Sequence, residues 1–204
     1  SHMKQLASSL VMCCRYQEAL DIYQCLMRDE RVTLNEIRGN YSICLAYLGR
    51  FDEALPLIDE LIANHLHDPS VVLMRATIHL LHERWEEGWK DYLWRGTSIK
   101  HHLRTLPFDK WNGADLKGKT IVLLAEQGLG DQIMFASCIP DILAMQPKRV
   151  VLESSNRVAK VLARSFESCE IIASKQSTNL SWASRLQDVD CFAPLGDLPF
   201  HFRR

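Results

Sequence analysis

The chain has 204 residues, of which 47% are hydrophobic and 24% charged, a composition typical of a folded protein and not of a disordered one. Its 24 basic and 25 acidic residues nearly cancel, so no overall charge favours binding to nucleic acid or to an anionic membrane. No apolar run approaches the ~20 residues that a membrane-spanning helix needs. We therefore expect one domain or two small ones, with no membrane span and no nucleic-acid partner.

The first half of the chain contains an internal repeat. Residues 15–20, 50–55 and 84–89 share a basic residue, an aromatic residue, two polar or acidic residues and then a small one. The period of about 34 residues resembles the tetratricopeptide repeat, a helix-turn-helix unit. The resemblance implies an α-helical solenoid over residues 4–95. The expected helix pairs are 4–13 with 16–29, 33–48 with 51–64, and 69–82 with 85–95.

The repeat resemblance also implies a groove, lined by the first helix of each pair, that binds a protein or peptide; a helical spacer or a dimerisation surface is the alternative. Asn40 lies on one of these first helices, at a position resembling the asparagine ladder of protein O-GlcNAc transferases. Gln5 and Met74 occupy the corresponding positions of the neighbouring repeats, so no ladder is formed. Asn40 is therefore a single candidate partner-binding residue.

The last predicted helix of the repeat carries two packing signals. Trp85, Trp89 and Tyr92 recur at helical spacing on one face, which favours packing in a core. Gly88 costs about 1 kcal/mol relative to alanine inside a helix, so its presence there suggests that another element approaches closely.

Cysteine usage bears on the cellular compartment. The seven cysteines include no C-x-x-C pair, and most lie within apolar stretches. This pattern indicates buried thiols in a reducing compartment. We therefore expect a cytoplasmic protein.

After a polar connector at 96–118, the hydrophobic pattern changes to that of an α/β domain. Residues 119–125 read as a buried parallel strand, because they are branched and largely apolar on both faces. A glycine loop at 128–131 and a helix reaching residue 144 follow. The next expected elements are strands at 149–153, 170–173 and 189–193, with a helix at 156–165. This alternation predicts a doubly wound parallel sheet over residues 119–204.

The glycine loop is the main chemical feature of the second half. Gly128 and Gly130 follow a buried strand and precede a helix, where a backbone can turn tightly and approach a ligand. Asp131 then either serves a bound substrate or only caps the helix. A dinucleotide site would use Glu153 on the ribose, but Ile133 replaces the third glycine of that fingerprint. A phosphate-binding P-loop is excluded because the G-K-[ST] sequence is absent.

Four short motifs, taken in their order along the chain, resemble those of a larger protein family. Residues 88–95, 126–135, 164–166 and 194–199 resemble those of bacterial tetratricopeptide-repeat proteins that carry a glycosyltransferase-like domain. Such domains are similar to GT-B glycosyltransferases, which are built from two Rossmann halves and include the heptosyltransferases and protein O-GlcNAc transferases. The resemblance implies that residues 119–204 form the N-terminal, acceptor-side half, and that the C-terminal, donor-binding half lies beyond Arg204.

The resemblance also implies roles for individual residues. The heptosyltransferase loop has a similar Leu-Gly-Asp, matched here by Asp131, which would be the base that deprotonates the acceptor hydroxyl of a glycan or protein. Glu126, Gln127, Gly128 and Gly130 would line the substrate site. No cofactor is implied within this chain, because the nucleotide-sugar donor would bind the second half, and the fragment alone would be inactive.

No metal site is predicted. His101 and His102 are adjacent but have no carboxylate or cysteine at ligand spacing. A non-catalytic interaction scaffold remains the alternative to a glycosyltransferase.

Overall fold

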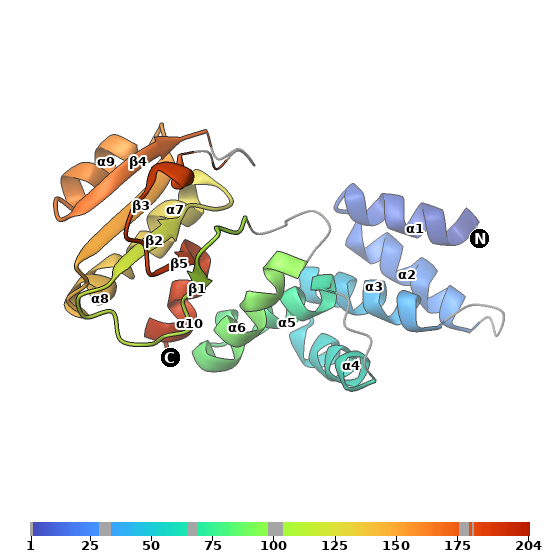
Figure 1. Ribbon diagram of the computed structural model, residues 1–204. Helices are drawn as coiled ribbons and strands as arrows, with labels where there is room; N and C mark the ends of the chain where they lie inside the picture. Colours follow the sequence, from blue (N-terminus) through green and yellow to red (C-terminus); the bar gives the residue numbers. More distant parts are fainter. Residues whose placement is uncertain (1, 29–33, 65–68, 98–103, 176–179, 181) are drawn as a thin grey trace. The chain divides into compact units, whose positions relative to one another are not determined.

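The computed structural model describes residues 2–28, 34–64, 69–97, 104–175, 180 and 182–204. The chain forms two compact units, Ser1–Ser98 and Ile99–Arg204 (Figure 1). The first unit is α-helical and the second contains a parallel β-sheet. Each unit is described by itself below.

The helical unit consists of consecutive helices that pack as antiparallel neighbours. Each helix contacts the next one along the chain (Figure 1). Its described elements are α1 (His2–Met12), α2 (Tyr16–Met27), α3 (Leu34–Tyr47), α4 (Phe51–Ala63), α5 (Pro69–Leu81), α6 (Trp85–Tyr92) and the 3₁₀ turn η1 (Leu93–Thr97). These bounds lie close to the predicted helix pairs; the predicted helix ends at residues 29 and 33 fall outside the described residues.

The turns within the three helix pairs have the same geometry. Cys14, Gly49 and Glu83 each adopt the left-handed conformation, with φ of 58°, 74° and 57°. The next residue in each turn is an arginine whose N–H reaches back to the preceding helix: Arg15 to Leu10 O, Arg50 to Leu45 O and Arg84 to His79 O, each at 2.9 Å. A left-handed residue at this place ends one helix and lets the next begin. The sequence repeat is thus a repeat in three dimensions.

Small residues allow these helices to approach closely. Ala7, Ala19, Ala54 and Ala76 are fully buried in the helical unit. At Gly88 an added Cβ would lie 2.7 Å from Leu80 Cδ2 and 3.2 Å from the Leu80 backbone nitrogen, so α6 approaches α5 where a side chain cannot fit. The close approach expected at Gly88 is confirmed. The expected core role of Trp85 is wrong, because this side chain at the first position of α6 is 43% exposed.

The cysteines also differ from expectation. Cys44, Cys138, Cys169 and Cys191 are buried, but Cys13, Cys14 and Cys25 are exposed. The first two lie where α1 ends and the chain turns, and Cys25 lies on an outward-facing position of α2. All seven are free thiols.

The second unit contains a five-stranded, fully parallel sheet of order β1-β5-β2-β3-β4. The chain runs from β2 outward through β3 to β4, and then returns to place β5 on the other side of β2. The elements are β1 (Asp109–Lys110), β2 (Thr120–Leu124), α7 (Leu129–Ala136), α8 (Ile139–Ala144), β3 (Arg149–Ser155), α9 (Ala159–Ser165), β4 (Cys169–Ser174), η2 (Ala183–Arg185), β5 (Cys191–Pro194), η3 (Leu195–Asp197) and α10 (Leu198–Phe202).

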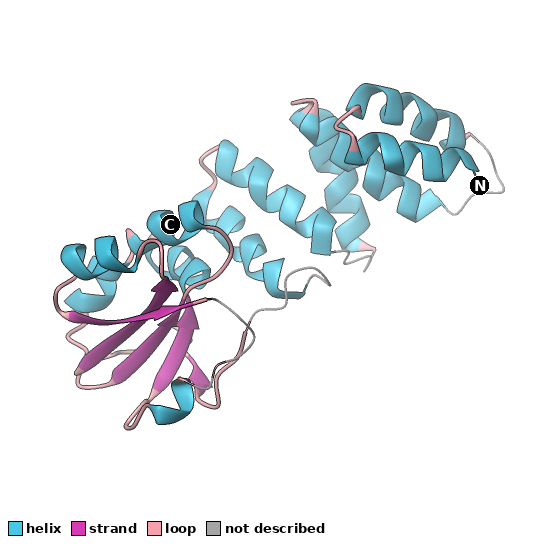
Figure 2. Ribbon diagram, turned by 90° about the horizontal axis from the view of Figure 1, so that it is seen from above, coloured by secondary structure: helices cyan, strands magenta, loops and turns pink. Residues whose placement is uncertain are grey.

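The two faces of the sheet are covered differently. Figure 2 shows the α-helices of this unit on one side and a single short turn on the other. On that second side, Val122, Val151 and Phe192 pack against Leu106, from an irregular segment, and against Ala183, the first residue of η2. The sheet is therefore helix-covered on one face only in the part of the chain that the structure describes, and differs there from the predicted doubly wound arrangement.

Two further predictions are corrected. The helix expected to reach residue 144 is broken into α7 and α8, because Pro140 lacks the N–H that would continue the helix and restricts the residue before it. The polar connector predicted at 96–118 contributes to the second unit: β1 pairs with β5, and Leu106, Trp111 and Leu116 are buried.

A search of the described residues for a helix long and apolar enough to span a membrane found none.

The left-handed turn residues give a stability test. Gly49→Ala should lower the free energy of unfolding by about 1 kcal/mol, because a side chain in this conformation costs ~1–2 kcal/mol and no neighbour lies within 4 Å of the new methyl group. Glu83→Gly should raise it by roughly 0.5 kcal/mol. Gly39→Ala, within α3, is the matched control and should be stabilising by up to ~1 kcal/mol. Urea denaturation followed by circular dichroism measures all three; an unchanged Gly49→Ala variant would contradict the assignment.

Candidate functional site

The candidate site lies at the carboxyl edge of the sheet, where the strand order reverses between β2 and β5. In parallel α/β sheets the loops that leave two such strands diverge and open a crevice that binds ligands. Here the loop after β2 comprises residues 125–128, and the loop after β5 is the 3₁₀ turn η3 at residues 195–197. All of the predicted site residues of the second unit follow β2 at this edge.

Glu126 joins the two loops. Its Oε1 accepts a hydrogen bond from the backbone N–H of Gly196 at 2.7 Å. This partly exposed carboxylate therefore connects the loop after β2 to η3 and satisfies one of the backbone N–H groups of η3. The structure places this predicted substrate-binding residue at the site, with one of its oxygens engaged by the protein itself.

The tight turn of the glycine loop is made at Gln127. This exposed residue has φ of 56°, whereas Gly128 has φ of −86° and ψ of 179°, an extended conformation that any residue can adopt. The expectation that the glycines permit the turn is therefore wrong. A non-glycine residue in this conformation is uncommon and is often found at functional sites. Gly130 is exposed, and a Cβ added there would meet nothing within 4 Å, so the first turn of α7 presents bare backbone.

Asp131 occupies the third position of α7. Its Oδ2 accepts a hydrogen bond from the N–H of Gly128, the residue that caps the helix, at 2.8 Å. This bond is one half of a capping box; the other half is not formed, because Gly128 has no side chain to return a bond. Asp131 is partly exposed, so its carboxylate both stabilises the helix end and remains reachable from solvent.

Gln132 fixes α7 against the sheet. Its buried side chain donates from Nε2 to Gly128 O at 3.3 Å and accepts the Ser155 N–H at Oε1, at 2.9 Å. These bonds connect the glycine loop to the end of β3. Gln132 was not identified from the sequence; a glutamine on an otherwise apolar helix face was the available signal.

A buried ion pair lies beside the loop. Arg104 donates to both carboxylate oxygens of Glu153, at 2.8 and 2.6 Å, and also to Ala125 O. Ser174 donates its hydroxyl to Glu153 Oε1 at 2.6 Å. The Glu153 side chain is fully buried. The carboxylate that a dinucleotide site would present to a ribose is thus enclosed and hydrogen-bonded, which removes that alternative.

A second polar cluster, formed by residues at the ends of β1 and β5, was not predicted. The Lys110 ammonium lies 2.7 Å from Asp197 Oδ2, an almost fully buried carboxylate, while Lys110 itself is exposed. His201 packs on Trp111 with ring centroids 4.5 Å apart, and burial lowers its pKa below the usual value. Gly113 permits this packing, because a Cβ there would lie 2.8 Å from His201 Nδ1.

The remaining predicted residues lie elsewhere. Asn40 is partly exposed on α3 and belongs to the helical unit, whereas the loop residues belong to the second unit. His101 and His102 lie outside the described residues. Within the described ranges, no group of three or more His, Cys, Asp or Glu side chains is arranged to hold a metal ion.

Comparison with known proteins gives one partial similarity. The chain is 39% identical over 103 residues to protein FlbA of Caulobacter vibrioides (strain ATCC 19089 / CIP 103742 / CB 15). The match covers 48% of this chain and 17% of FlbA. No family model matches the chain, and no solved structure matches it significantly.

The buried ion pair should be important for the stability of the α/β unit. Arg104→Met should lower the free energy of unfolding by about 3 to 5 kcal/mol, because it leaves a charged carboxylate buried without its cation. The double variant Arg104→Met/Glu153→Met should lose less than the single variant.

Arg149→Met is the matched control, because Arg149 pairs with Glu170 on the exposed surface of the same sheet and should contribute less than about 1 kcal/mol. If Arg104→Met and Arg149→Met lower the free energy of unfolding equally in chemical denaturation, the buried ion pair contributes no more to stability than the exposed one.

Proposed function

We propose that the chain is part of a repeat-containing glycosyltransferase of the GT-B type, with a tetratricopeptide solenoid followed by a Rossmann-like acceptor half. The three turns recur with a period of 34 to 35 residues and share a left-handed residue and a backbone hydrogen bond, which supports the solenoid. The order β4-β3-β2-β5 corresponds to the 3-2-1-4 arrangement of a Rossmann half, and supports the second unit.

The observation that carries the catalytic proposal is the position of Asp131. Its carboxylate lies next to the loop that follows β2, beside the strand reversal, and remains partly exposed while one oxygen accepts the Gly128 N–H. A base for glycosyl transfer must be held by the protein and must also be reachable by the acceptor hydroxyl. Bare backbone at Gly130 would let a glycan or protein acceptor approach the same helix end.

In this proposal the acceptor occupies the edge of the sheet described above. Glu126 and Gln127 line it, and Gly128 and Gly130 form its floor. The nucleotide-sugar donor would bind a second α/β half, which the described residues, with a single five-stranded sheet, do not contain. We expect no separate cofactor in this chain.

The helical unit would bind a protein or peptide partner. Asn40 on α3 is the proposed polar contact, because it is partly exposed on the first helix of its pair. Free cysteines throughout the chain support a cytoplasmic location as part of the proposal.

A non-catalytic scaffold is the second candidate, and one observation favours it. Both loop carboxylates, Glu126 and Asp131, accept backbone N–H groups, as purely structural side chains would. If Glu126 and Asp131 serve only to accept these backbone hydrogen bonds, the loop is a structural turn and the chain acts through its helical unit alone.

The Asp131→Asn variant separates the two candidates in the full-length protein. Asparagine keeps an oxygen that can accept the Gly128 N–H but cannot take a proton, so the melting temperature should change little. If Asp131 is the base, glycosyl transfer should fall by ~10²- to 10⁴-fold. Asp131→Ala should lower stability by ~1 kcal/mol and abolish the same activity. Wild-type turnover in the asparagine variant would remove Asp131 from catalysis and leave the loop as a structural turn.

A further inference from the structure

Exposed apolar side chains gather at the turns within the helix pairs. The large hydrophobic side chains exposed there are Met12 (77%), Tyr47 (56%), Leu48 (36%), Leu81 (63%) and Trp85 (43%). Soluble proteins seldom leave several large apolar residues together in water unless the surface binds something. The turns at 12–16, 47–51 and 81–85 therefore share exposed apolar side chains, which their turn geometry does not require.

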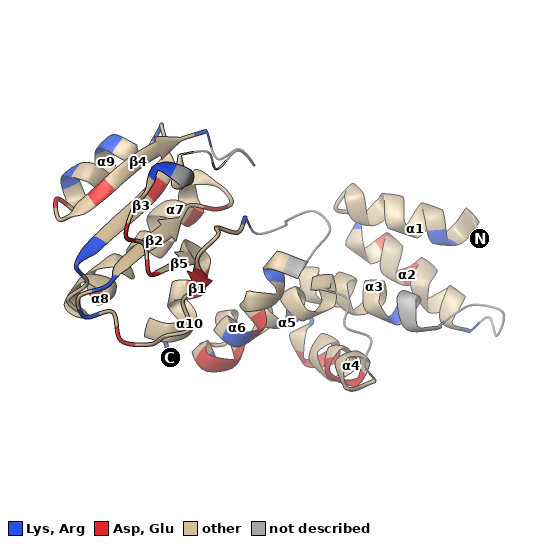
Figure 3. Cartoon of the chain, viewed as in Figure 1, with Lys and Arg blue, Asp and Glu red and all other residues tan. Residues whose placement is uncertain are grey.

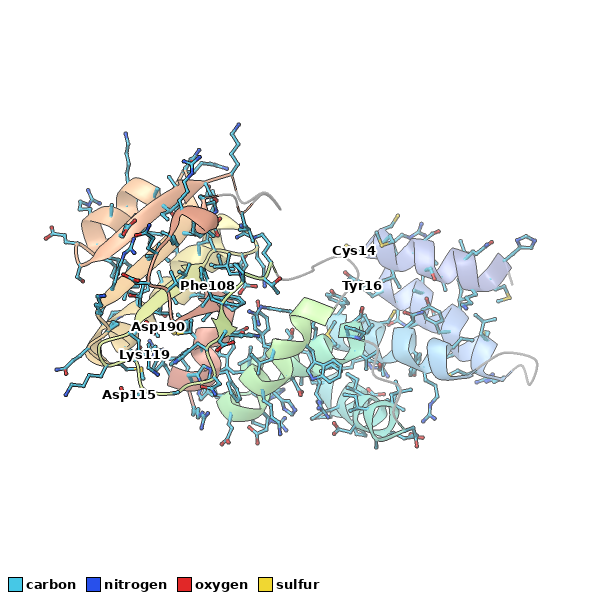
Figure 4. All side chains as sticks on the ribbon, viewed as in Figure 1. Cys14, Tyr16, Phe108, Asp115, Lys119 and Asp190 are labelled. Carbon is cyan, nitrogen blue, oxygen red and sulfur yellow. The ribbon has the colours of Figure 1, made fainter. Side chains whose placement is uncertain are left out.

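These three turns form one continuous edge, which we call the turn edge. The Tyr16 ring stacks on Tyr47 of the next pair, with centroids 4.5 Å apart and an angle of 9° between the rings. Phe51 meets His82 of the third pair edge to face, at 5.5 Å. Figure 4 shows Cys14 and Tyr16 at the first of these turns. Ring contacts thus connect the first turn to the second and the second to the third.

Met12, Tyr47 and Leu81 occupy the same place in successive repeats, as the last residues of α1, α3 and α5. The turn edge is therefore a ladder of three apolar rungs, spaced 35 and 34 residues apart in the sequence. Such a ladder is self-complementary: when two copies face each other in opposite directions, the second rung meets itself and the first rung meets the third. A two-fold axis generates this arrangement.

The charges beside the ladder fit that arrangement. Arg15 donates to both carboxylate oxygens of Glu18, and Arg50 donates to both of Glu53. Residues 14–18 of the first turn therefore carry no net charge, whereas residues 49–53 of the second turn, which also include Asp52, carry a charge of −1. The third turn, at 83–87, contains three glutamates and one arginine, and Figure 3 shows the acidic residues at the start of α6. Antiparallel pairing places each third turn, with a charge of −2, against an uncharged first turn, whereas parallel pairing would place the two third turns together; the second turns meet each other in both arrangements.

The exposed area is also sufficient. At roughly 180 Å² for a large side chain, the exposed fractions of the five residues correspond to about 500 Å² of apolar surface per copy. A stable interface buries about 800 Å² per partner, of which ~65% is apolar in homodimers. From the ladder, its charges and its area, we propose that the turn edge is a dimerisation surface that binds a second copy of this chain in antiparallel register.

Sedimentation velocity on the whole chain tests the proposal. The 23.5 kDa chain should sediment as a dimer at tens of micromolar. Raising the salt concentration should change the Kd by less than about threefold, because the contacts are apolar and the arginines of the first two turns are paired within their own turns. Leu81→Lys should weaken dimerisation by at least about tenfold, since the change occurs twice in a two-fold interface.

Leu6→Lys is the matched control, because Leu6 is 54% exposed on α1 but lies away from the turns. It should leave the Kd unchanged. A monomeric wild-type chain would overturn the proposal, and dissociation by Leu6→Lys but not by Leu81→Lys would place the interface on the outer face of α1 instead.

A mixing experiment tests the register. Met12→Lys and Leu81→Glu should each be monomeric alone, because two copies of either variant bury unpaired charges. Mixed in equal amounts, they should form a heterodimer in which Lys and Glu meet at one contact and the native pair at the other. Circular dichroism of each variant confirms folding. Failure of the mixture to dimerise, with both variants folded, would overturn the antiparallel register.

Discussion

The hydrogen bond from the Gly196 N–H to Glu126 is the interaction on which the candidate site depends. It connects the loops after β2 and β5, which leave the sheet on opposite sides of its point of reversal and would otherwise diverge. With this bond in place, the chain enters α7 through the left-handed Gln127, and Asp131 folds back onto Gly128. Gln132 then fixes the same helix to the end of β3. A charged acceptor makes each carboxylate bond stronger than an ordinary one.

In both units, backbone N–H groups at the ends of helices and strands form hydrogen bonds that hold neighbouring segments together. In the helical unit, the left-handed residue of each turn directs the following arginine N–H back to the preceding helix, and this is repeated three times. In the α/β unit, side chains perform the same task at the sheet edge. This difference accounts for the residue types at the two places. In the helical turns the hydrogen bonds are made by the backbone, so the side chains can be apolar. At the sheet edge the hydrogen bonds are made by side chains, which must therefore be carboxylates and an amide.

The repeat was predictable because its signal is periodic. Arginine, aromatic and small residues recur at fixed spacing, and each spacing reports a packing constraint such as the approach of α6 to Leu80 at Gly88. The buried strands were predictable from continuous branched residues. The two-residue strand β1 was not, because its exposed side chains carry no pattern and only its backbone pairs with β5. Contacts between distant residues, such as Arg104 with Glu153 and Lys110 with Asp197, also left no local signal.

The most direct test of this account is amide hydrogen exchange at Gly196, measured by NMR in the wild-type chain and in the Glu126→Ala variant. The account predicts that the wild-type amide is protected and that removal of the carboxylate increases its exchange rate by about tenfold or more, since a hydrogen bond to a charged group contributes ~1.5–3 kcal/mol. The Gly128 amide, which Asp131 holds independently, should change little. Equal exchange of Gly196 in both proteins would show that Glu126 does not join the two loops.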